Sequence, residues 1–482
     1  MFRPILAALL AATALNACAA ATPEQQIVND AAAALGGRER VLAVKTLVLE
    51  GGGTNGNLLQ DMTPDASGQA FLVSGYRRAI DIAGGRARTE QTRTPNFAYF
   101  QGMAPQRQLS GIDGDVGYNV AANGAATRVP NTTARDRRAE LLHHPLTIVR
   151  AALDPAARLT HARTAGGERV VDVTIADGST CTLAIDATTR LPTRVVSMTD
   201  NANLGDVAVE TSFADYQDVA GLKLPARLTM KTDKYTTATL QLTQQRVNAD
   251  TGDLAAPAAA ASAAPIAGPP TPVVTIEEVA KGIWLLAGQS HNSAVVEFDD
   301  HLTLIEAPQS EARTMAVIAE ARKLRPGKPL TQLVSTHFHS DHTGGLRAAV
   351  AEGLTVITHE GNAGYYADAA KRPHTLAPDA LARNPKSLKI ETVGEERQIA
   401  DRTMSVELYH IAGNPHADTL LMAYFPKQRV LVEADAFSPG SATQPYAANL
   451  LENITKRQLK VERVVPLHGR VTPFTEVVRA VP

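Results

Sequence analysis

One short stretch of the chain is dense in residues that bind metals. Three histidines and an aspartate fall within six positions, directly after the strand-like residues 333–335: His337, His339, Asp341 and His342. Alternate residues of an extended segment project to the same side, so His337 and His339 face one point. The other two lie past the strand end and reach a neighbouring point. Imidazole and carboxylate groups suit zinc or another first-row metal, so the spacing predicts two adjacent metal ions.

Three further candidate ligands lie downstream, each after a strand-like segment: His416, Asp435 and His468. His416 ends the tight turn 412–416, and Asp435 closes the apolar run 430–434. Ten of the 13 histidines lie after residue 290, which places the metal chemistry in the C-terminal half. Because ligand sites of α/β proteins gather at the ends of strands, we expect these three residues to join the first cluster.

The elements that must hold these residues mix strands with helices. Helices are expected at residues 311–324 and 346–352, and strands at residues 283–286, 293–298, 302–306, 332–336, 355–358, 404–409, 420–424, 429–432 and 464–465. This mixture favours two sheets sandwiched between helices, with the ligands on loops at one sheet edge.

The N-terminal half has a different pattern. After a short helix at residues 24–35, alternating runs such as residues 44–50 predict strand after strand, and Asp177-Gly178 marks a hairpin. We expect an antiparallel, curved sheet or half-barrel. We therefore divide the chain into a signal peptide (1–21), a β-rich domain (22–253), an Ala/Pro linker (254–273) that builds no core, and the metal-binding domain (274–482).

The first 21 residues predict export. Arg3 precedes an apolar run at residues 5–15 that is too short to span a bilayer. Residues 15–18, Leu-Asn-Ala-Cys, resemble a bacterial lipobox in which Cys18 becomes lipidated, and cleavage within residues 17–21 is the alternative. We expect a periplasmic protein or an outer-membrane lipoprotein, with membrane contact only through an anchor at Cys18. The other cysteine, Cys181, is predicted to be a structural thiol.

The composition excludes one class of partner. Lys+Arg 47 against Asp+Glu 49 leaves a formal charge of -2, and aromatic residues make up 4% of the chain. Neither a basic field nor a stacking surface for nucleic acid is indicated. A small-molecule substrate, hydrophobic or acylated, is the expected partner.

The motif His-x-His-x-Asp-His, followed by Gly-x-x-His, a strand-end Asp and a late His-Gly, resembles the metallo-β-lactamase fold superfamily over roughly residues 273–482. The resemblance implies an αββα sandwich with a dinuclear site. It assigns His337, His339 and His416 to the first metal, Asp341, His342 and His468 to the second, and Asp435 as the bridge. The bridging aspartate is more similar to the glyoxalase II and lactonase branches than to the true β-lactamases. Glu306 stands where this fold usually has an aspartate.

The N-terminal half resembles the outer-membrane lipoprotein carrier family. The similar segments are Ala34-Leu35-Gly36-Gly37 and residues 215–225. This resemblance implies a half-barrel whose apolar hollow holds an acyl chain or another lipid. A scaffold without a ligand is the alternative.

Together these features predict an exported, zinc-dependent hydrolase with two zinc ions. Zinc lowers the pKa of a bound water to about 7, and the resulting hydroxide would attack an ester, lactone, thioester or amide carbonyl. Asp341 would orient this nucleophile and so act as the catalytic residue. The alternatives are an enzyme with one iron, similar to a persulfide dioxygenase, and a non-catalytic lipid- or ligand-binding protein.

The remaining histidines receive smaller roles. His291 is expected near substrate at the mouth of the site, and Tyr365-Tyr366 are candidates for the pocket lining. His143, His144 and His161 are predicted to be surface or capping residues, and His359 and His410 to be structural or to lie directly behind the ligands.

Overall fold

The computed structural model describes residues 21–66 and 68–481 of the chain. The predicted signal segment up to residue 20, including Cys18, lies outside the described residues. Within the described part, no helix combines the length and the apolar character that crossing a bilayer requires.

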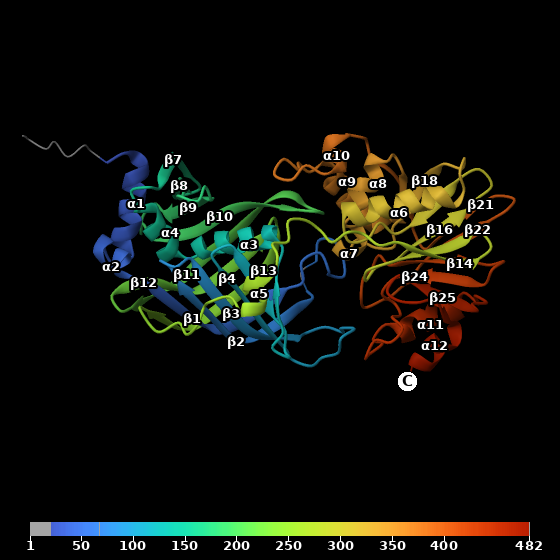
Figure 1. Ribbon diagram of the computed structural model, residues 1–482, viewed down its shortest axis with the longest axis horizontal. Helices are drawn as coiled ribbons and strands as arrows, with labels where there is room; N and C mark the ends of the chain where they lie inside the picture. Colours follow the sequence, from blue (N-terminus) through green and yellow to red (C-terminus); the bar gives the residue numbers. More distant parts are fainter. Residues whose placement is uncertain (1–20, 67, 482) are drawn as a thin grey trace, which may run out of the picture.

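The N-terminal half is built on one antiparallel sheet of 13 strands, in the order β6-β5-β4-β3-β2-β1-β13-β12-β11-β10-β9-β8-β7 (Figure 1). This confirms the prediction of an antiparallel, β-rich region. Its strands are β1 (Thr46–Gly56), β2 (Ala70–Asp81), β3 (Arg86–Pro95), β4 (Gln106–Asp113), β5 (Val116–Val120), β6 (Ala126–Arg128), β7 (Arg158–Ala165), β8 (Glu168–Thr174), β9 (Thr180–Asp186), β10 (Pro192–Asn201), β11 (Gly205–Val219), β12 (Leu222–Thr232) and β13 (Tyr235–Val247). The hairpin at Asp177-Gly178 joins β8 to β9 as predicted.

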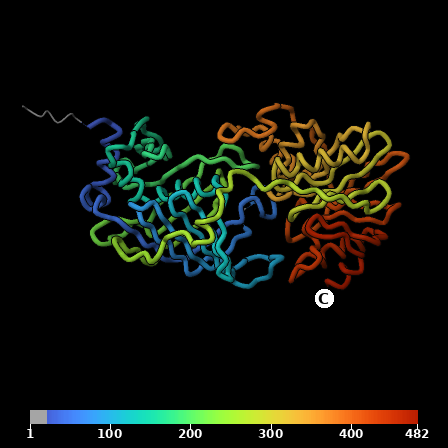
Figure 2. The backbone as a smooth tube through the Cα atoms, in the orientation of Figure 1, coloured from blue at the N-terminus to red at the C-terminus, as the bar shows by residue number. Residues whose placement is uncertain are grey.

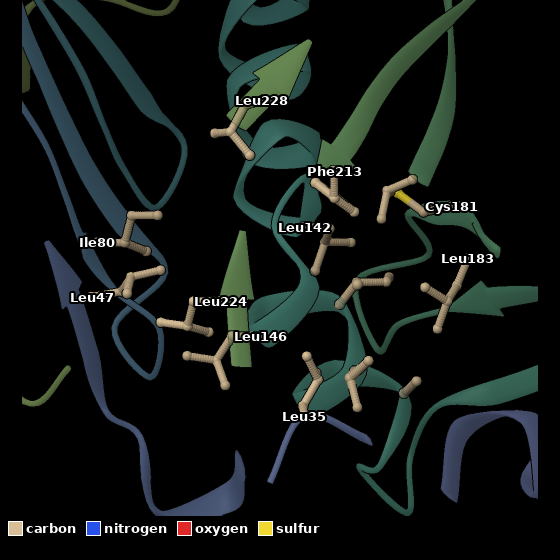
Figure 3. Close-up of a cluster of buried hydrophobic side chains, with 14 of the residues drawn as sticks. Leu35, Leu47, Ile80, Leu142, Leu146, Cys181, Leu183, Phe213, Leu224 and Leu228 are labelled. Carbon is tan, nitrogen blue, oxygen red and sulfur yellow. The ribbon is translucent and has the colours of Figure 1, made fainter. Parts of the chain in front are cut away.

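The sheet curves around the helix α4 (Pro145–Ala152). Leu146 of α4 shares one hydrophobic core with Ile80 of β2 and Leu183 of β9 (Figure 3). In a flat sheet, the six strand spacings from β2 to β9 would separate these residues by about 29 Å. A helix of eight residues is only about 12 Å long, so the sheet must wrap around it. The edge strands β6 and β7 leave the curve open, as in a half-barrel.

The remaining helices of this half are α1 (Pro23–Ala34), α2 (Arg38–Ala43), α3 (Asn131–Ala139) and the short 3-10 helix η1 (Glu140–Leu142). Thr22 begins α1 with a capping box to Gln25. Cys181 is buried, and burial raises the pKa of its thiol to about 12, as expected of a structural cysteine.

One histidine of this half differs from the prediction. His143 is buried, with its ring nitrogens 2.9 Å from Thr211 Oγ1 and 3.0 Å from Ser197 Oγ, so its side chain is neither on the surface nor a helix cap. His144 caps α4 by accepting from Leu146 N, as predicted, and is buried there. His161 is exposed, as predicted.

The linker was expected to contribute nothing to a core, and this too is wrong. Residues 254–273 contain a short helix, α5 (Ala258–Ser262), and they bury Leu254 and Ala260. Leu254 packs with Val48 and Ala79 of the sheet. Alanine and leucine side chains are apolar enough to be buried when the chain runs along a protein surface.

The C-terminal half has the predicted four layers. One sheet has the order β14-β15-β16-β17-β18-β19-β20 and the other β21-β22-β23-β24-β25-β26. Their strands are β14 (Thr275–Ala280), β15 (Ile283–Ala287), β16 (Ser293–Glu297), β17 (Leu302–Ile305), β18 (Leu330–Val334), β19 (Thr355–His359), β20 (Lys389–Val393), β21 (Glu396–Ala400), β22 (Ser405–His410), β23 (Leu421–Phe425), β24 (Val430–Glu433), β25 (Arg463–Pro466) and β26 (Thr472–Pro473).

Alternation along the strands explains the layers. In β18, Val334 joins the core between the two sheets, and Leu333 joins the core under the helices. The helices are α6 (Glu311–Leu324), α7 (Ser340–Thr343), α8 (Leu346–Ala351), the short 3-10 helix η2 (Glu360–Asn362), α9 (Ala363–Lys371) and α10 (Ala380–Arg383) beside the first sheet, and α11 (Ala447–Lys456) and α12 (Phe474–Ala480) beside the second (Figure 1). This is the predicted αββα sandwich.

The two halves are in contact through loops of the N-terminal sheet (Figure 2). One core cluster contains Leu59, Leu204 and Val207 from the N-terminal half together with Phe338 and Tyr365 from the C-terminal half. A second loop, after β3, accepts a hydrogen bond at Ala98 O from the hydroxyl of Tyr446, at 2.7 Å.

Candidate metal centre

The histidine-rich segment occupies the turn between β18 and α7. His337 and His339 lie in the extended stretch after β18, and Asp341 and His342 lie on α7. The turn packs closely on its neighbours, because a Cβ at Gly344 would lie 2.2 Å from the backbone oxygen of Gln309. Glycine at this position therefore allows α7 to sit against the loop after β17.

The second sheet brings the three downstream candidates to the same edge. His416 follows β22, Asp435 follows β24 and His468 follows β25. Strands β24 and β25 are parallel, so their carboxyl ends lie together. Asp435 has a φ of 59°, a left-handed conformation that short polar side chains tolerate better than most residues.

The predicted ligands converge in two groups of side chains. His337, His339, His416 and Asp435 form the first, and the second contains Asp341, His342, His468 and His291. Within each group, the potential ligand atoms all lie within 4.8 Å of one another.

Asp435 connects the two groups. Its Oδ2 lies 3.3 Å from His337 Nε2, 3.1 Å from His416 Nε2 and 2.8 Å from His342 Nε2. Its Oδ1 lies 2.9 Å from His468 Nε2. One carboxylate therefore faces both groups, which is the placement expected of a bridging ligand.

A buried carboxylate sets the tautomers of two of these histidines. Glu306 Oε2 accepts from Thr336 Oγ1 at 2.5 Å and from His342 Nδ1 at 3.0 Å. Since the Thr336 hydroxyl donates to Glu306, its oxygen accepts from His337 Nδ1, 3.0 Å away. Both imidazoles thus carry a proton on Nδ1, and both Nε2 atoms point into the site, where each offers a lone pair to a metal ion once it carries no proton.

His339 has the opposite tautomer. Its Nε2 lies 2.8 Å from the backbone oxygen of Asp61, which can only accept, so this nitrogen carries the proton. Its Nδ1 is buried and has no hydrogen-bond partner among the described residues. A buried lone pair without a donor fits a metal ligand, and His416 Nε2 and His337 Nε2 face each other at 3.3 Å. The donor set therefore fits metal ions.

The electrostatics of the site also favour cations. Burial opposes ionisation of Asp435, but the surrounding imidazoles outweigh it and hold the pKa of this carboxyl well below its usual range. Burial likewise opposes a charge on His342, yet the carboxylates of Asp435 and Asp341 raise its pKa. Burial lowers the pKa of His337 to about 4 and holds that of His339 well below its usual range, so both are neutral and available as ligands.

All seven predicted ligands meet here, and their metal-binding role stays a prediction. His291, expected to contact substrate, instead lies among the second group, with Nε2 3.0 Å from Asp341 Oδ2. Its position before β16 was the signal that could have placed it here, because β16 starts at the carboxyl end of β17.

Other predicted residues lie outside the two groups. Tyr366 does not line a pocket: it is buried and donates to the backbone oxygen of His337 at 2.9 Å, which supports the ligand segment. The rings of His359 and His410 lie 4.5 Å apart, away from the donors, as expected of structural histidines.

The comparisons with known proteins concern this half of the chain. Residues 286–468 match the model of a family described as the metallo-beta-lactamase superfamily. A linear primary-alkylsulfatase from Pseudomonas sp. (strain ATCC 19151) is 25% identical over 231 residues, which are 39% of this chain and 43% of the alkylsulfatase. The chain thus spans less than half the length of that relative.

Two further matches are similar in extent. A metallo-beta-lactamase type 2 from Bacillus cereus is 22% identical over 222 residues, covering 42% of this chain and 78% of the relative. The crystal structure of the DIM-1 metallo-beta-lactamase is 20% identical, covers 43% of this chain and 95% of its own, and superposes with a TM-score of 0.33.

Proposed function

We propose that this chain is a metal-dependent hydrolase with a dinuclear zinc centre, because residues 286–468 match the model of the metallo-beta-lactamase superfamily. The observation that carries the proposal is that imidazole nitrogens converge on the Asp435 carboxylate. The ring N–H groups that point away from the site donate to Glu306, Thr336 and the Asp61 carbonyl. His337, His339 and His416 would hold one ion, and Asp341, His342 and His468 the other, with Asp435 between them.

Each residue has a defined part in the reaction. Zinc, when bound, supplies a Lewis acid and activates water for attack at neutral pH. The side chain of Asp341 is 35% exposed, whereas those of His337 and His342 are fully buried. Asp341 is therefore the ligand that faces an incoming substrate, and it would orient the attacking water. The buried imidazoles exclude bulk water from the side of the metal centre opposite Asp341.

Metal content is the first test. Purified protein should contain about two zinc ions per chain by plasma mass spectrometry, and His339→Ala should lower this number because it removes a ligand of the first group. One iron per chain would instead support a persulfide-dioxygenase-like enzyme. A chain that binds no metal, even after zinc is supplied, would contradict the proposal and leave a non-catalytic binding protein.

The bond that is cleaved is the second question. The matched relatives act on an alkyl sulfate and on β-lactams, according to their names, and the resemblance of Asp435 to the bridging aspartate of the glyoxalase II and lactonase branches adds esters, lactones and thioesters. A panel of these five substrate types should show zinc-dependent turnover of at least one. Asp341→Ala should abolish that turnover, and a variant that kept full activity would contradict the catalytic role of Asp341.

We also propose that the substrate is hydrophobic or acylated and that the N-terminal half captures it. A cavity of about 770 Å³ lies beside α4, where apolar residues such as Ile80, Ile82 and Leu142 line it together with charged residues such as Arg138 and Arg150. Ala151→Trp should narrow this cavity. We expect the KM of this variant to rise for substrates with long acyl chains and to stay unchanged for short ones. Equal KM values for the wild type and Ala151→Trp at all chain lengths would contradict capture of the substrate by the N-terminal half.

Export with a lipid anchor at Cys18 is proposed from the sequence. In a bacterial host, the full chain should fractionate with membranes, and Cys18→Ser should release it as a soluble periplasmic protein. Retention in the cytoplasm would contradict export.

A further inference from the structure

A segment of the N-terminal half reaches into the metal centre. Residues 57–66 follow β1 and run toward α7 (Figure 1). Three consecutive residues of this segment form hydrogen bonds with three consecutive residues of the ligand turn. Leu59 O accepts from Ser340 N at 3.2 Å, Gln60 Nε2 donates to Asp341 Oδ1 at 2.5 Å, and Asp61 O accepts from His339 Nε2 at 2.8 Å.

The segment is held in place from both sides. Leu59 is 4% exposed and belongs to the same core as Phe338, the residue between the two ligand histidines. The Asp61 carboxylate accepts from Met62 N at 2.7 Å and from Gln69 N at 2.8 Å, which closes the turn on itself. Met62 O in turn accepts from Asp418 N at 2.8 Å, two residues after the ligand His416. The contact is therefore specific and buried.

Each hydrogen bond leaves one ligand atom free for metal. With its proton committed to the Asp61 carbonyl, His339 presents the lone pair of Nδ1 to the first group. With Gln60 on Oδ1, Asp341 presents Oδ2 to the second group, where His291 and His342 lie. Partners of this kind fix the orientation and basicity of metal ligands.

We propose that Gln60 and Asp61 are positioning residues of the metal centre, so that the N-terminal half completes a site whose ligands all belong to the C-terminal half. Asp61 orients His339 for the first ion, and Gln60 orients Asp341 for the second. This inference rests on the proposed metal centre. It predicts that two substitutions in one loop lower the affinity of the protein for two different metal ions.

The test is a zinc titration of metal-free, full-length protein against a chromophoric chelator. Gln60→Ala should lower the affinity for the second ion by about 10- to 100-fold. Asp61→Ala opens the turn that presents the carbonyl and should lower the affinity for the first ion by a similar factor. Histidine 15N resonances show which of the two ions has lost affinity, because zinc at the first group shifts the resonances of His339 and zinc at the second group shifts those of His342. In the metal-free state, Asp61→Ala should also convert His339 from a single Nε2–H tautomer to a mixture.

Asp65→Ala is the matched control. It removes a carboxylate from the same segment, but this side chain is 80% exposed, and its ion pair within the described part of the chain is with Lys234 of the N-terminal half. Its zinc affinities should equal those of the wild type. Fluorescence of the single tryptophan, Trp284, checks that each variant keeps a folded C-terminal half.

The outcomes separate the two proposals. Wild-type affinities for both ions in Gln60→Ala and Asp61→Ala would overturn the positioning role and leave the metal centre intact. Failure of the wild type to bind zinc would overturn the metal centre itself and the inference with it. If Asp61→Ala does not fold, Gln60→Ala decides, because its loss must be confined to the ion beside His342.

Discussion

The Oε2 atom of Glu306 lies 3.0 Å from Nδ1 of His342, and both side chains are completely buried. The same oxygen accepts from the Thr336 hydroxyl, which itself accepts from His337. One carboxylate therefore orients a ligand of each group. Glu306 stands where the resembled fold usually has an aspartate, and behind the metal site it still accepts hydrogen bonds from His342 and Thr336.

Glu306→Gln should weaken both zinc ions. An amide NH2 cannot accept a hydrogen bond. In place of Oε2 it removes the acceptor of both His342 and the Thr336 hydroxyl, and in place of Oε1 it faces the backbone N–H of Thr336, which donates to Oε1 at 3.2 Å. In either orientation the arrangement that sets the tautomers of His342 and His337 is disturbed. We expect a loss of zinc affinity of about 10- to 100-fold, measured by chelator competition. Glu320→Gln, a change in a surface ion pair with Lys323, should behave like the wild type.

Asp435→Asn should lower the metal content from two ions to one or none. Asparagine tolerates the φ of 59° at this position, so the backbone conformation is retained while the bridging charge is lost. Plasma mass spectrometry of the purified variant provides the measurement. Asp418→Asn, an exposed carboxylate in the loop that carries His416, serves as the control. Two ions per chain in Asp435→Asn would contradict the bridging role.

Removing the metal should destabilise the C-terminal half. A ligand that binds only the folded state stabilises it by about 4 kcal/mol when its free concentration is 1,000 times Kd. Trp284 is buried in β15, so its fluorescence reports unfolding of this half. A chelator should shift the denaturation midpoint of the wild type to lower denaturant concentration. The shift should be much smaller in Asp435→Asn, and equal shifts in both proteins would count against metal binding at this site.

The N-terminal half should lose stability in mild acid. Burial lowers the pKa of His143 from 6.5 to about 4, so the folded state binds fewer protons than the unfolded state between these values. Stability is therefore lost as the pH falls from about 6.5 to about 4, with a slope of up to about 1.4 kcal/mol per pH unit for this residue. Hydrogen exchange of peptides from α4 measures the effect.

His143→Gln removes this titration and retains groups that can bond to Ser197 and Thr211. The variant should start less stable at neutral pH, because the imidazole no longer fills its site, but its stability should fall less steeply in acid. A slope equal to that of the wild type would show that His143 does not take up a proton on unfolding.

The ligand set was predictable from the sequence because it depends on local geometry. His337, His339, Asp341 and His342 are neighbours in the chain. The strand period of two and the turn after β18 bring their side chains together without help from distant segments. His416, Asp435 and His468 could be found because each follows an apolar strand. The αββα layers follow from the same alternation of apolar residues.

Only the tertiary structure decided which groups stand behind the ligands. Asp61 and Gln60 lie about 280 positions before His339 and Asp341, and nothing in the periodicity of either segment indicates that they meet. His291 reaches the second group because β16 and β17 are antiparallel, so its position before β16 became informative only once this strand pairing was known. His143 was misplaced for a related reason: its neighbours Ser197 and Thr211 are brought to it by the curvature of the sheet. Local spacing determines which residues can bind a metal, whereas packing between distant segments determines their tautomers, their burial and their partners.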